Sequence, residues 1–200
     1  MAAGEVFAEH GFRAATVRDI CQRAGSNVAA VNYHFRDKEH LYAAVLEYAH
    51  GYAIEKHPPL LGLAADAPAE QRLQAFVRSF LLRILDEGRP AWHGKLMAHE
   101  FAEPTSALDK VVEQSVRPLF NLLVSIIREL AGPDAPNECV RLCAASVVGQ
   151  CLHFYHARPV IARLNPAVSY SPAGLTALAD HVARFSLAAI RGFFRQEGGA

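Results

Sequence analysis

The fold of this chain is decided by residues 11–42, which read GFRAATVRDICQRAGSNVAAVNYHFRDKEHLY. Thr16 and Asn27 are residue types that cap the first turn of a helix, and each stands before a short segment whose apolar residues recur every three or four positions. Gly25, between the two segments, adopts a left-handed turn without a steric penalty. Two short helices joined by a tight glycine turn are a helix-turn-helix, and this stretch predicts one.

The second helix of such a pair enters the major groove of DNA, and its first residues face the base edges. Val31 and Phe35 are four residues apart, so we expect both to point inward and hold this helix on its core. Small side chains at Ala29 and Ala30 allow the helix to approach the groove closely. The residues expected to face outward are Val28, Ala29, Asn32 and Tyr33.

The polar side chains of this region have the chemistry of DNA contacts. Asn32 is able to read adenine or to hold a phosphate, and Tyr33 and His34 are able to donate to phosphate oxygens. Lys38 begins the next helix, where we expect its ammonium to face the sugar-phosphate chain. A protein–DNA interface is therefore predicted on the second helix and the turn after it.

A helical interaction protein without sequence-specific DNA binding is the alternative, because a short helix carrying Tyr and His also serves to cover the core of a small bundle. The formal net charge of the chain is 0, which gives no general support for a nucleic-acid partner. Between residues 13 and 38, however, five side chains are basic and two are acidic. Positive charge is thus concentrated around the proposed reading helix, as phosphate binding requires.

Helical periodicity continues to the end of the chain and strand signals are almost absent, so an all-α fold is predicted. Asp37 caps a fourth helix, and the prolines and glycine at about residues 58–68 mark a connection. Pro118 is expected to bend a long helix that stops at Gly132.

Composition and motifs argue against several other classes of protein. The N-terminus has no secretory signal pattern and no apolar run is long enough to span a bilayer, so we expect a cytoplasmic protein without a membrane partner. His99-Glu100 lacks a second histidine at metal-ligand spacing, and no serine or glycine motif of catalysis is present, so an enzyme is not expected. Cys151 and His153 lie on different helix faces. These two side chains are therefore not expected to share a metal ion. We expect reduced thiols, no metal site and no cofactor.

Two pieces of the chain resemble known sequences. Residues 11–42 follow the pattern of the N-terminal DNA-binding domain of the TetR/AcrR family of transcriptional regulators almost throughout. EPTSALD at 103–109, RPLF at 117–120 and SVVGQCLHFYHARPV at 146–160 are similar to the CecR-like branch of that family. The resemblance implies a three-helix DNA-binding domain over residues 1–46 and a helical effector-binding and dimerisation domain over residues 47–200.

The same resemblance implies a homodimer that binds a palindromic operator in double-stranded DNA, usually represses, and releases the DNA when a small molecule enters the C-terminal domain. Carried over to matching positions, the DNA contacts are Thr16, Asn27, Ala29, Ala30, Tyr33, His34 and Lys38. Family members usually carry further residues ahead of the position that is Ala2 here, so the first helix is truncated. Either the start is misplaced or the contacts of an N-terminal arm are missing.

The helices expected at about residues 137–157 and 172–195 carry apolar seams and small residues, and two from each chain would form a dimer bundle. The alternative is that both helices are buried within one chain. Aromatic side chains with sparse polar groups are typical of a ligand pocket, and Glu100 and Arg117 need partners in a mostly apolar setting. The candidate effector residues are Trp92, Met97, Glu100, Arg117, Phe120, Gln150 and Tyr155.

Overall fold

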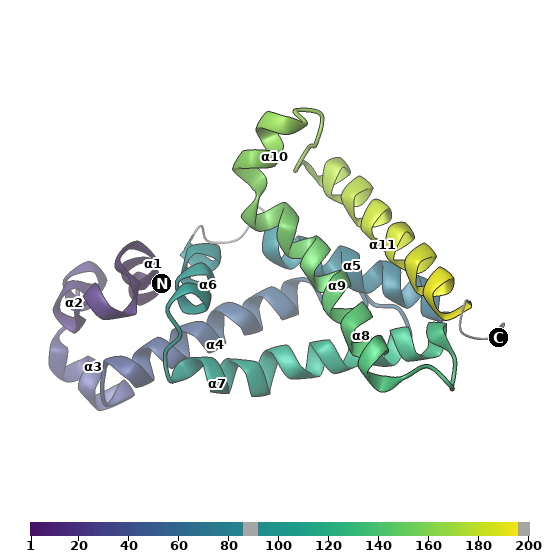
Figure 1. Cartoon of the computed structure of the whole chain (residues 1–200). Coiled ribbons are helices and arrows are strands. Elements are labelled where there is room, and N and C mark those ends of the chain that lie inside the picture. Colours follow the sequence, from purple (N-terminus) through teal and green to yellow (C-terminus); the bar gives the residue numbers. More distant parts are fainter. Residues whose placement is uncertain (86–91, 196–200) are drawn as a thin grey trace. The chain divides into compact units, whose positions relative to one another are not determined.

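The computed structural model describes residues 1–85 and 92–195, and every regular element within them is helical (Figure 1). The elements are α1 (Ala2–Ala14), α2 (Val17–Ala24), α3 (Val28–Phe35), α4 (Lys38–Lys56), α5 (Ala69–Leu85), α6 (Trp92–Ala102), α7 (Ala107–Val111), the π-helical turn η1 (Val112–Val116), α8 (Arg117–Ala131), α9 (Asn137–His156), α10 (Arg158–Leu164) and α11 (Pro172–Arg195). Within the described ranges, none of these helices has both the length and the apolar character that a bilayer span requires.

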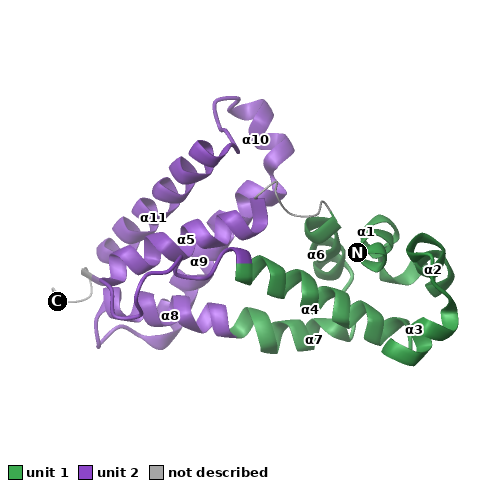
Figure 2. Ribbon diagram, turned by 180° about the vertical axis from the view of Figure 1, so that it is seen from behind, with its two compact units in different colours: residues 1–55, 87–117 green, residues 56–86, 118–200 purple. Residues whose placement is uncertain are grey.

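The chain divides into two compact units (Figure 2). Unit 1 comprises residues 1–55 and 87–117, and unit 2 comprises residues 56–86 and 118–200. The expected division between residues 46 and 47 falls inside α4, and unit 1 adds α6 and α7 to the first helices. The functional domain limits remain a prediction. Unit 1 contains segments of both predicted domains, whereas unit 2 lies within the predicted C-terminal domain.

The caps and the turn of residues 11–42 form as predicted. The Thr16 hydroxyl oxygen accepts a hydrogen bond from the backbone N–H of Asp19 at 3.1 Å, and the Asn27 side-chain oxygen accepts one from Ala30 at 2.8 Å. Gly25 ends α2 in the left-handed region with φ 62° and ψ 31°. Local sequence chemistry therefore sets the helix-turn-helix of α2 and α3.

A tight turn joins α3 to α4. Arg36 has φ 72° and ψ −54°, and the N–H of Asp37 donates to the carbonyl of Phe35 at 2.9 Å. These values describe a γ-turn of the strained type, which a non-glycine residue rarely adopts. Asp37 then caps α4 as predicted, because its carboxylate accepts from the N–H of His40 at 2.9 Å.

The predicted long helix around Pro118 is interrupted instead of smoothly bent. In a regular helix the proline ring would meet the carbonyl of residue 114. The chain widens before it into η1, where the N–H of Arg117 bonds to the carbonyl of Val112 across five residues. The π-helical turn thus accommodates the proline, and α8 continues to Ala131, before Gly132.

The core of unit 1 joins α1, α4 and α6. The rings of Phe7 and Tyr42 meet edge to face with centroids 4.8 Å apart, and both side chains are fully buried. Trp92 lies against Gly4, where an added Cβ would stand 2.6 Å from the indole ring. Glycine is therefore required at residue 4 for α6 to approach α1 this closely.

The core of unit 2 is built from α5, α8, α9 and α11. Of the predicted α9 seam, Val140, Ala144, Val147 and Cys151 are buried within this single chain, whereas Phe154 is only partly buried. Of the predicted α11 seam, Leu175 and Val182 are buried, whereas Phe185 is exposed. The apolar period of α9 therefore marks its intrachain face.

Candidate nucleic-acid interface

The outer surface of α3 carries the side chains that the sequence predicts to face DNA. Tyr33 is 86% exposed, and Val28, Ala29, Asn32 and His34 are also exposed. Val31 is buried, which fixes the opposite face of the helix on unit 1. Phe35, predicted to point inward, is 36% exposed and only partly covered.

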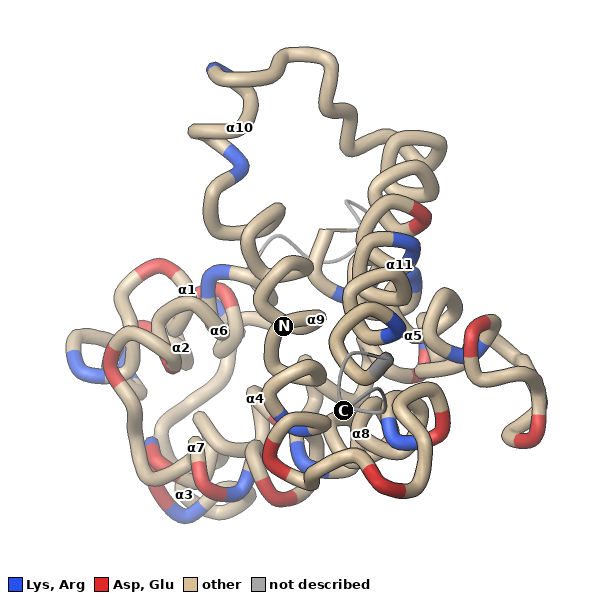
Figure 3. The backbone as a smooth tube through the Cα atoms, turned by 45° about the vertical axis from the view of Figure 1, so that its right-hand side comes forward, with Lys and Arg blue, Asp and Glu red and all other residues tan. Residues whose placement is uncertain are grey.

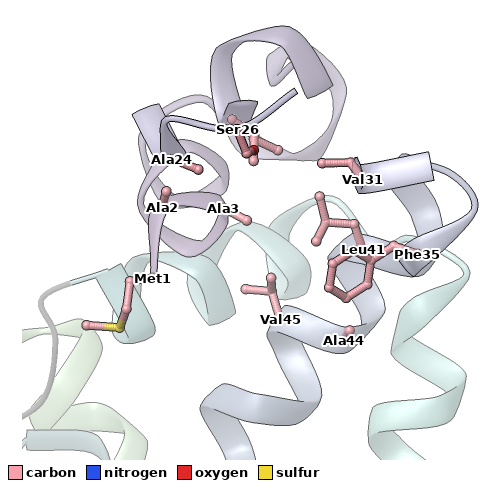
Figure 4. A pocket seen from close by; sticks show the side chains of 11 residues that line it. Met1, Ala2, Ala3, Ala24, Ser26, Val31, Phe35, Leu41, Ala44 and Val45 are labelled. Carbon is pink, nitrogen blue, oxygen red and sulfur yellow. The ribbon is translucent and has the colours of Figure 1, made fainter. Parts of the chain in front are cut away.

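The incomplete cover of Phe35 has a structural cause. An apolar pocket of about 300 Å³ lies behind α3 (Figure 4). It is lined by Met1, Ala2, Ala3, Ile20, Ala24, Ser26, Val31, Phe35, Leu41, Ala44 and Val45. None of the predicted effector residues lines this pocket.

Two predicted DNA contacts also serve as helix caps. The side-chain oxygen of Asn27 is used by Ala30, and the Thr16 hydroxyl donates to the Asp19 carboxylate at 2.6 Å while accepting from its N–H. The cap atoms of both residues are thus engaged within the protein. Their contact with DNA remains a prediction that these bonds do not test.

Lys38 is placed differently from the expectation that its ammonium faces phosphate. Its Nζ donates to the carbonyls of Phe12, Arg13 and Ala15 at 2.9, 3.4 and 3.1 Å. The same ammonium lies 4.6 Å from the centroid of the Phe12 ring. Because an ammonium has three N–H donors, these carbonyls account for all of them. Lys38 therefore ties the end of α1 to the start of α4, and this geometry gives its predicted DNA contact no support.

The remaining basic side chains around α3 differ in how strongly they are held. Arg23 forms two hydrogen bonds of 2.8 Å to Glu9, and these bonds lower the pKa of that carboxyl. Arg18 and Arg36 are exposed, and Arg13 lies 3.7 Å from Glu103 with most of its side chain in solvent. The structure thus adds three candidate phosphate ligands, namely Arg13, Arg18 and Arg36. In the sequence, these residues indicate only that positive charge is concentrated in this region.

Positive charge near α3 is local and not a property of the whole surface. Figure 3 shows basic and acidic residues interspersed along the backbone of both units. Phosphate contacts fix the register of a protein on DNA, and base contacts specify the sequence. Unit 1 offers groups for both kinds of contact: exposed arginines beside α3, and amide, phenol and methyl groups on α3.

Two predicted effector residues of unit 1, Glu100 and Arg117, are already partnered by protein. Glu100 is fully buried and accepts hydrogen bonds from the Tyr42 hydroxyl, the Thr105 N–H and the Thr105 hydroxyl at 2.9, 2.9 and 3.0 Å. Burial and the bond to Glu100 raise the pKa of Tyr42. Arg117 donates to Glu113 one helical turn before it at 2.7 Å, in an exposed pair. The need for a partner, which suggested these residues, is met inside the chain.

The other candidates are divided between the two units. Trp92 is buried in the core of unit 1, with Met97 partly buried beside that core. In unit 2, Phe120 lies 5.5 Å from the guanidinium of Arg141, and Gln150 donates to Ser186 at 3.1 Å. Tyr155 is partly buried against the core of unit 2. These contacts do not test the predicted effector pocket, which remains a prediction.

Comparison with known proteins extends over most of the chain. Residues 1–45 match the profile of bacterial regulatory proteins of the tetR family, and residues 69–190 match the C-terminal domain of the HTH-type transcriptional dual regulator CecR. The HTH-type transcriptional dual regulator CecR of Shigella flexneri is 31% identical over 156 residues, a match that covers 74% of this chain and 70% of the relative.

Solved structures have the same fold. A putative transcriptional regulator from Pseudomonas aeruginosa PAO1 superposes with a TM-score of 0.68 at 25% identity, covering 96% of this chain and 90% of that one. A transcriptional regulator from Rhodococcus sp. gives 0.66 at 22% identity, with 94% and 93% covered. A TetR family member from Streptomyces coelicolor A3 gives 0.62 at 21% identity, with 93% and 87% covered.

Proposed function

Because this chain belongs to the TetR family of bacterial transcriptional regulators and has a CecR-like C-terminal domain, we propose that it is a ligand-responsive repressor. As a homodimer it binds a palindromic operator, and a small-molecule effector releases it. It acts in the cytoplasm, where the operator is accessible. The family is one of regulators and not of enzymes.

The exposed face of α3 is the observation that carries this proposal. A capped helix that follows a left-handed glycine presents Asn32 and Tyr33 to solvent, while Val31 anchors the other side. An amide at this place is suited to a base edge or a phosphate, and the phenol to a phosphate oxygen. A helix that merely covered a core would turn its tyrosine inward. The exposure of Tyr33 therefore favours the regulator over the helical interaction protein.

Helices α9 and α11 pack against each other in unit 2. Their solvent-facing sides support a twofold assembly. Leu142 and Phe185 are large apolar side chains left exposed on these helices, at 60% and 59%. Small or polar exposed residues occupy neighbouring turns: Ala145, Ser146, Gly149 and His153 on α9, and Ala177, His181 and Ala188 on α11. Two copies of such a helix pair would close into an isologous four-helix bundle and bring two α3 helices onto one DNA duplex.

The sign of regulation depends on which state the effector binds better. We propose release on effector binding as the default for a repressor. The Shigella flexneri relative is a dual regulator, so one protein of this kind acts in both directions. For this chain, activation from some operators is then compatible with the same DNA-bound dimer.

The test is the substitution Tyr33→Ala, measured by fluorescence anisotropy on DNA selected by the wild-type chain. We expect a loss of about 5- to 150-fold in affinity, because a contact that becomes buried on DNA binding contributes roughly 1–3 kcal/mol, with unchanged circular dichroism. Tyr48→Ala, at an exposed tyrosine on α4 of the same unit, is the matched control and should bind as the wild type does. Equal affinity of all three proteins, or no selected DNA at all, would favour the interaction protein.

A further inference from the structure

Unit 2 contains a buried positive charge that its contacts leave unbalanced. Arg83 on α5 is 5% exposed, and its Nε donates to the carbonyl of Ser79 in a long bond of 3.4 Å. Over the described parts of the chain, its Nη1 and Nη2 atoms have no hydrogen-bond partner. Buried guanidinium groups are normally paired, because an unpaired charge in an apolar interior is strongly unfavourable.

The surroundings of Arg83 are apolar. Its guanidinium carbon lies 5.9 Å from the ring centroid of Phe76 and 5.5 Å from that of Phe80. Cys151 on α9 interacts with it electrostatically, but burial raises the pKa of this thiol to about 12, so the sulfur is neutral at physiological pH. Aromatic faces stabilise a cation only in part. The charge of Arg83 is therefore not neutralised by these neighbours.

A second buried arginine on the same helix has its hydrogen-bonding and charge requirements met by protein groups. Arg72 is also buried, and it donates to the carbonyl of Ala67 at 2.7 Å and forms an ion pair with Glu129. Burial lowers the pKa of Arg83 to about 10, which still leaves it protonated at neutral pH. Of these two arginines on α5, Arg83 is the one whose forked donors remain available.

We propose that Arg83 anchors a small organic carboxylate with an apolar body, and that this anion is the effector of the C-terminal domain. The two Nη groups present a planar fork that matches the two oxygens of a carboxylate. The one positive charge of Arg83 would be balanced by the one negative charge of the ligand, and the rings of Phe76 and Phe80 beside the guanidinium supply apolar surroundings for the ligand body. This identification of the effector class rests on the proposed function, whereas binding of the anion itself does not.

The test uses the full chain and thermal unfolding with the sodium salts of benzoate, phenylacetate and hexanoate as probes. At least one carboxylate should raise the unfolding temperature of the wild type, while benzamide and sodium chloride at equal concentration should not. Arg83→Met, which keeps the length and removes the charge, should weaken binding by about 10- to 100-fold, as expected for loss of a charged hydrogen-bond pair. No response of the wild type to any carboxylate, or an equal response of Arg83→Met, would overturn the proposal.

Stability without ligand provides an independent readout. Arg83→Met should unfold at the same or a higher temperature than the wild type, because an apolar side chain replaces an unbalanced charge. A clear drop would reveal a protein partner for Arg83 and overturn the proposal. Asp86 and Glu87 follow α5 in the sequence, outside the described residues, so the double variant Asp86→Asn/Glu87→Gln is combined with Arg83→Met. Additive effects are expected, and strong non-additivity would assign Arg83 to an intrachain pair.

Operator binding by the wild type is measured in parallel, so that the two proposals fail separately. Carboxylate binding without any operator binding would contradict the proposed repressor function and support the anion site. Operator binding without a carboxylate response would contradict the proposed anion site and leave the repressor function supported. When both hold, addition of the carboxylate should release operator DNA from the wild type.

Discussion

Replacing Lys38 by methionine tests whether this residue supports the fold or contacts phosphate. The ammonium donates to three carbonyls at the end of α1, and it faces the ring of Phe12. A hydrogen bond from a charged donor contributes about 1.5–3 kcal/mol. One of the three bonds is long at 3.4 Å, and the site is only partly buried. We therefore expect a total of about 2–3 kcal/mol rather than three full contributions.

The expected result is a lower free energy of unfolding with a nearly unchanged salt dependence of DNA binding. Urea denaturation gives the first quantity, and the slope of log affinity against log salt concentration gives the second. A phosphate contact would lower that slope by about one unit on removal. Lys95→Met, at an exposed lysine of unit 1, is the control and should leave the unfolding free energy unchanged. Wild-type stability of Lys38→Met together with a slope reduced by about one unit would refute the structural role.

Three further substitutions or labelling experiments probe the units separately. Glu100→Gln should lower the free energy of unfolding by about 2–3 kcal/mol in urea denaturation, because an amide is unable to accept all the hydrogen bonds that the buried carboxylate receives. The control Glu103→Gln, at an exposed residue, should leave that free energy unchanged. Arg36→Gly should raise the free energy of unfolding by about 1 kcal/mol through relief of its positive φ, and any decrease would argue against strain in that turn. Iodoacetamide at pH 8 should alkylate half-exposed Cys139 in the native protein and spare buried Cys151, as read by mass spectrometry. The reason is that the thiolate fraction of Cys151 is about a thousandfold smaller than that of an ordinary thiol. Labelling of Cys151 in the native protein would contradict its burial.

Local features of the fold were predictable from the sequence because their partners lie within a few residues. Thr16, Gly25 and Asn27 act through neighbours in the chain, so residue type and spacing are enough to identify caps and turn. The tertiary contact of Lys38 was not predictable, since its acceptors lie more than 20 residues earlier in the chain. The same is true of Glu100, whose partner Tyr42 is 58 residues away.

Periodicity also has a defined limit for α9 and α11. It identifies which residues share a face, but it does not say whether that face meets the same chain or a second copy. Ala144 and Ala179 are buried within the chain, whereas Ala145 and Gly149 are exposed. Buried polarity has a similar limit: it predicts a partner for Glu100 without saying whether that partner is ligand or protein, and here the Glu100 carboxylate is bonded by protein.

The central claim is that two copies of α3 read one DNA duplex. Selection of bound fragments from random double-stranded DNA by the wild-type chain, followed by footprinting of the enriched sequence, tests it for any operator sequence. The account predicts an inverted repeat whose two protected half-sites lie in major grooves on one side of the duplex, about 10 base pairs or a multiple apart. Failure to enrich any sequence, or enrichment of a single half-site that Tyr33→Ala binds equally well, would contradict it.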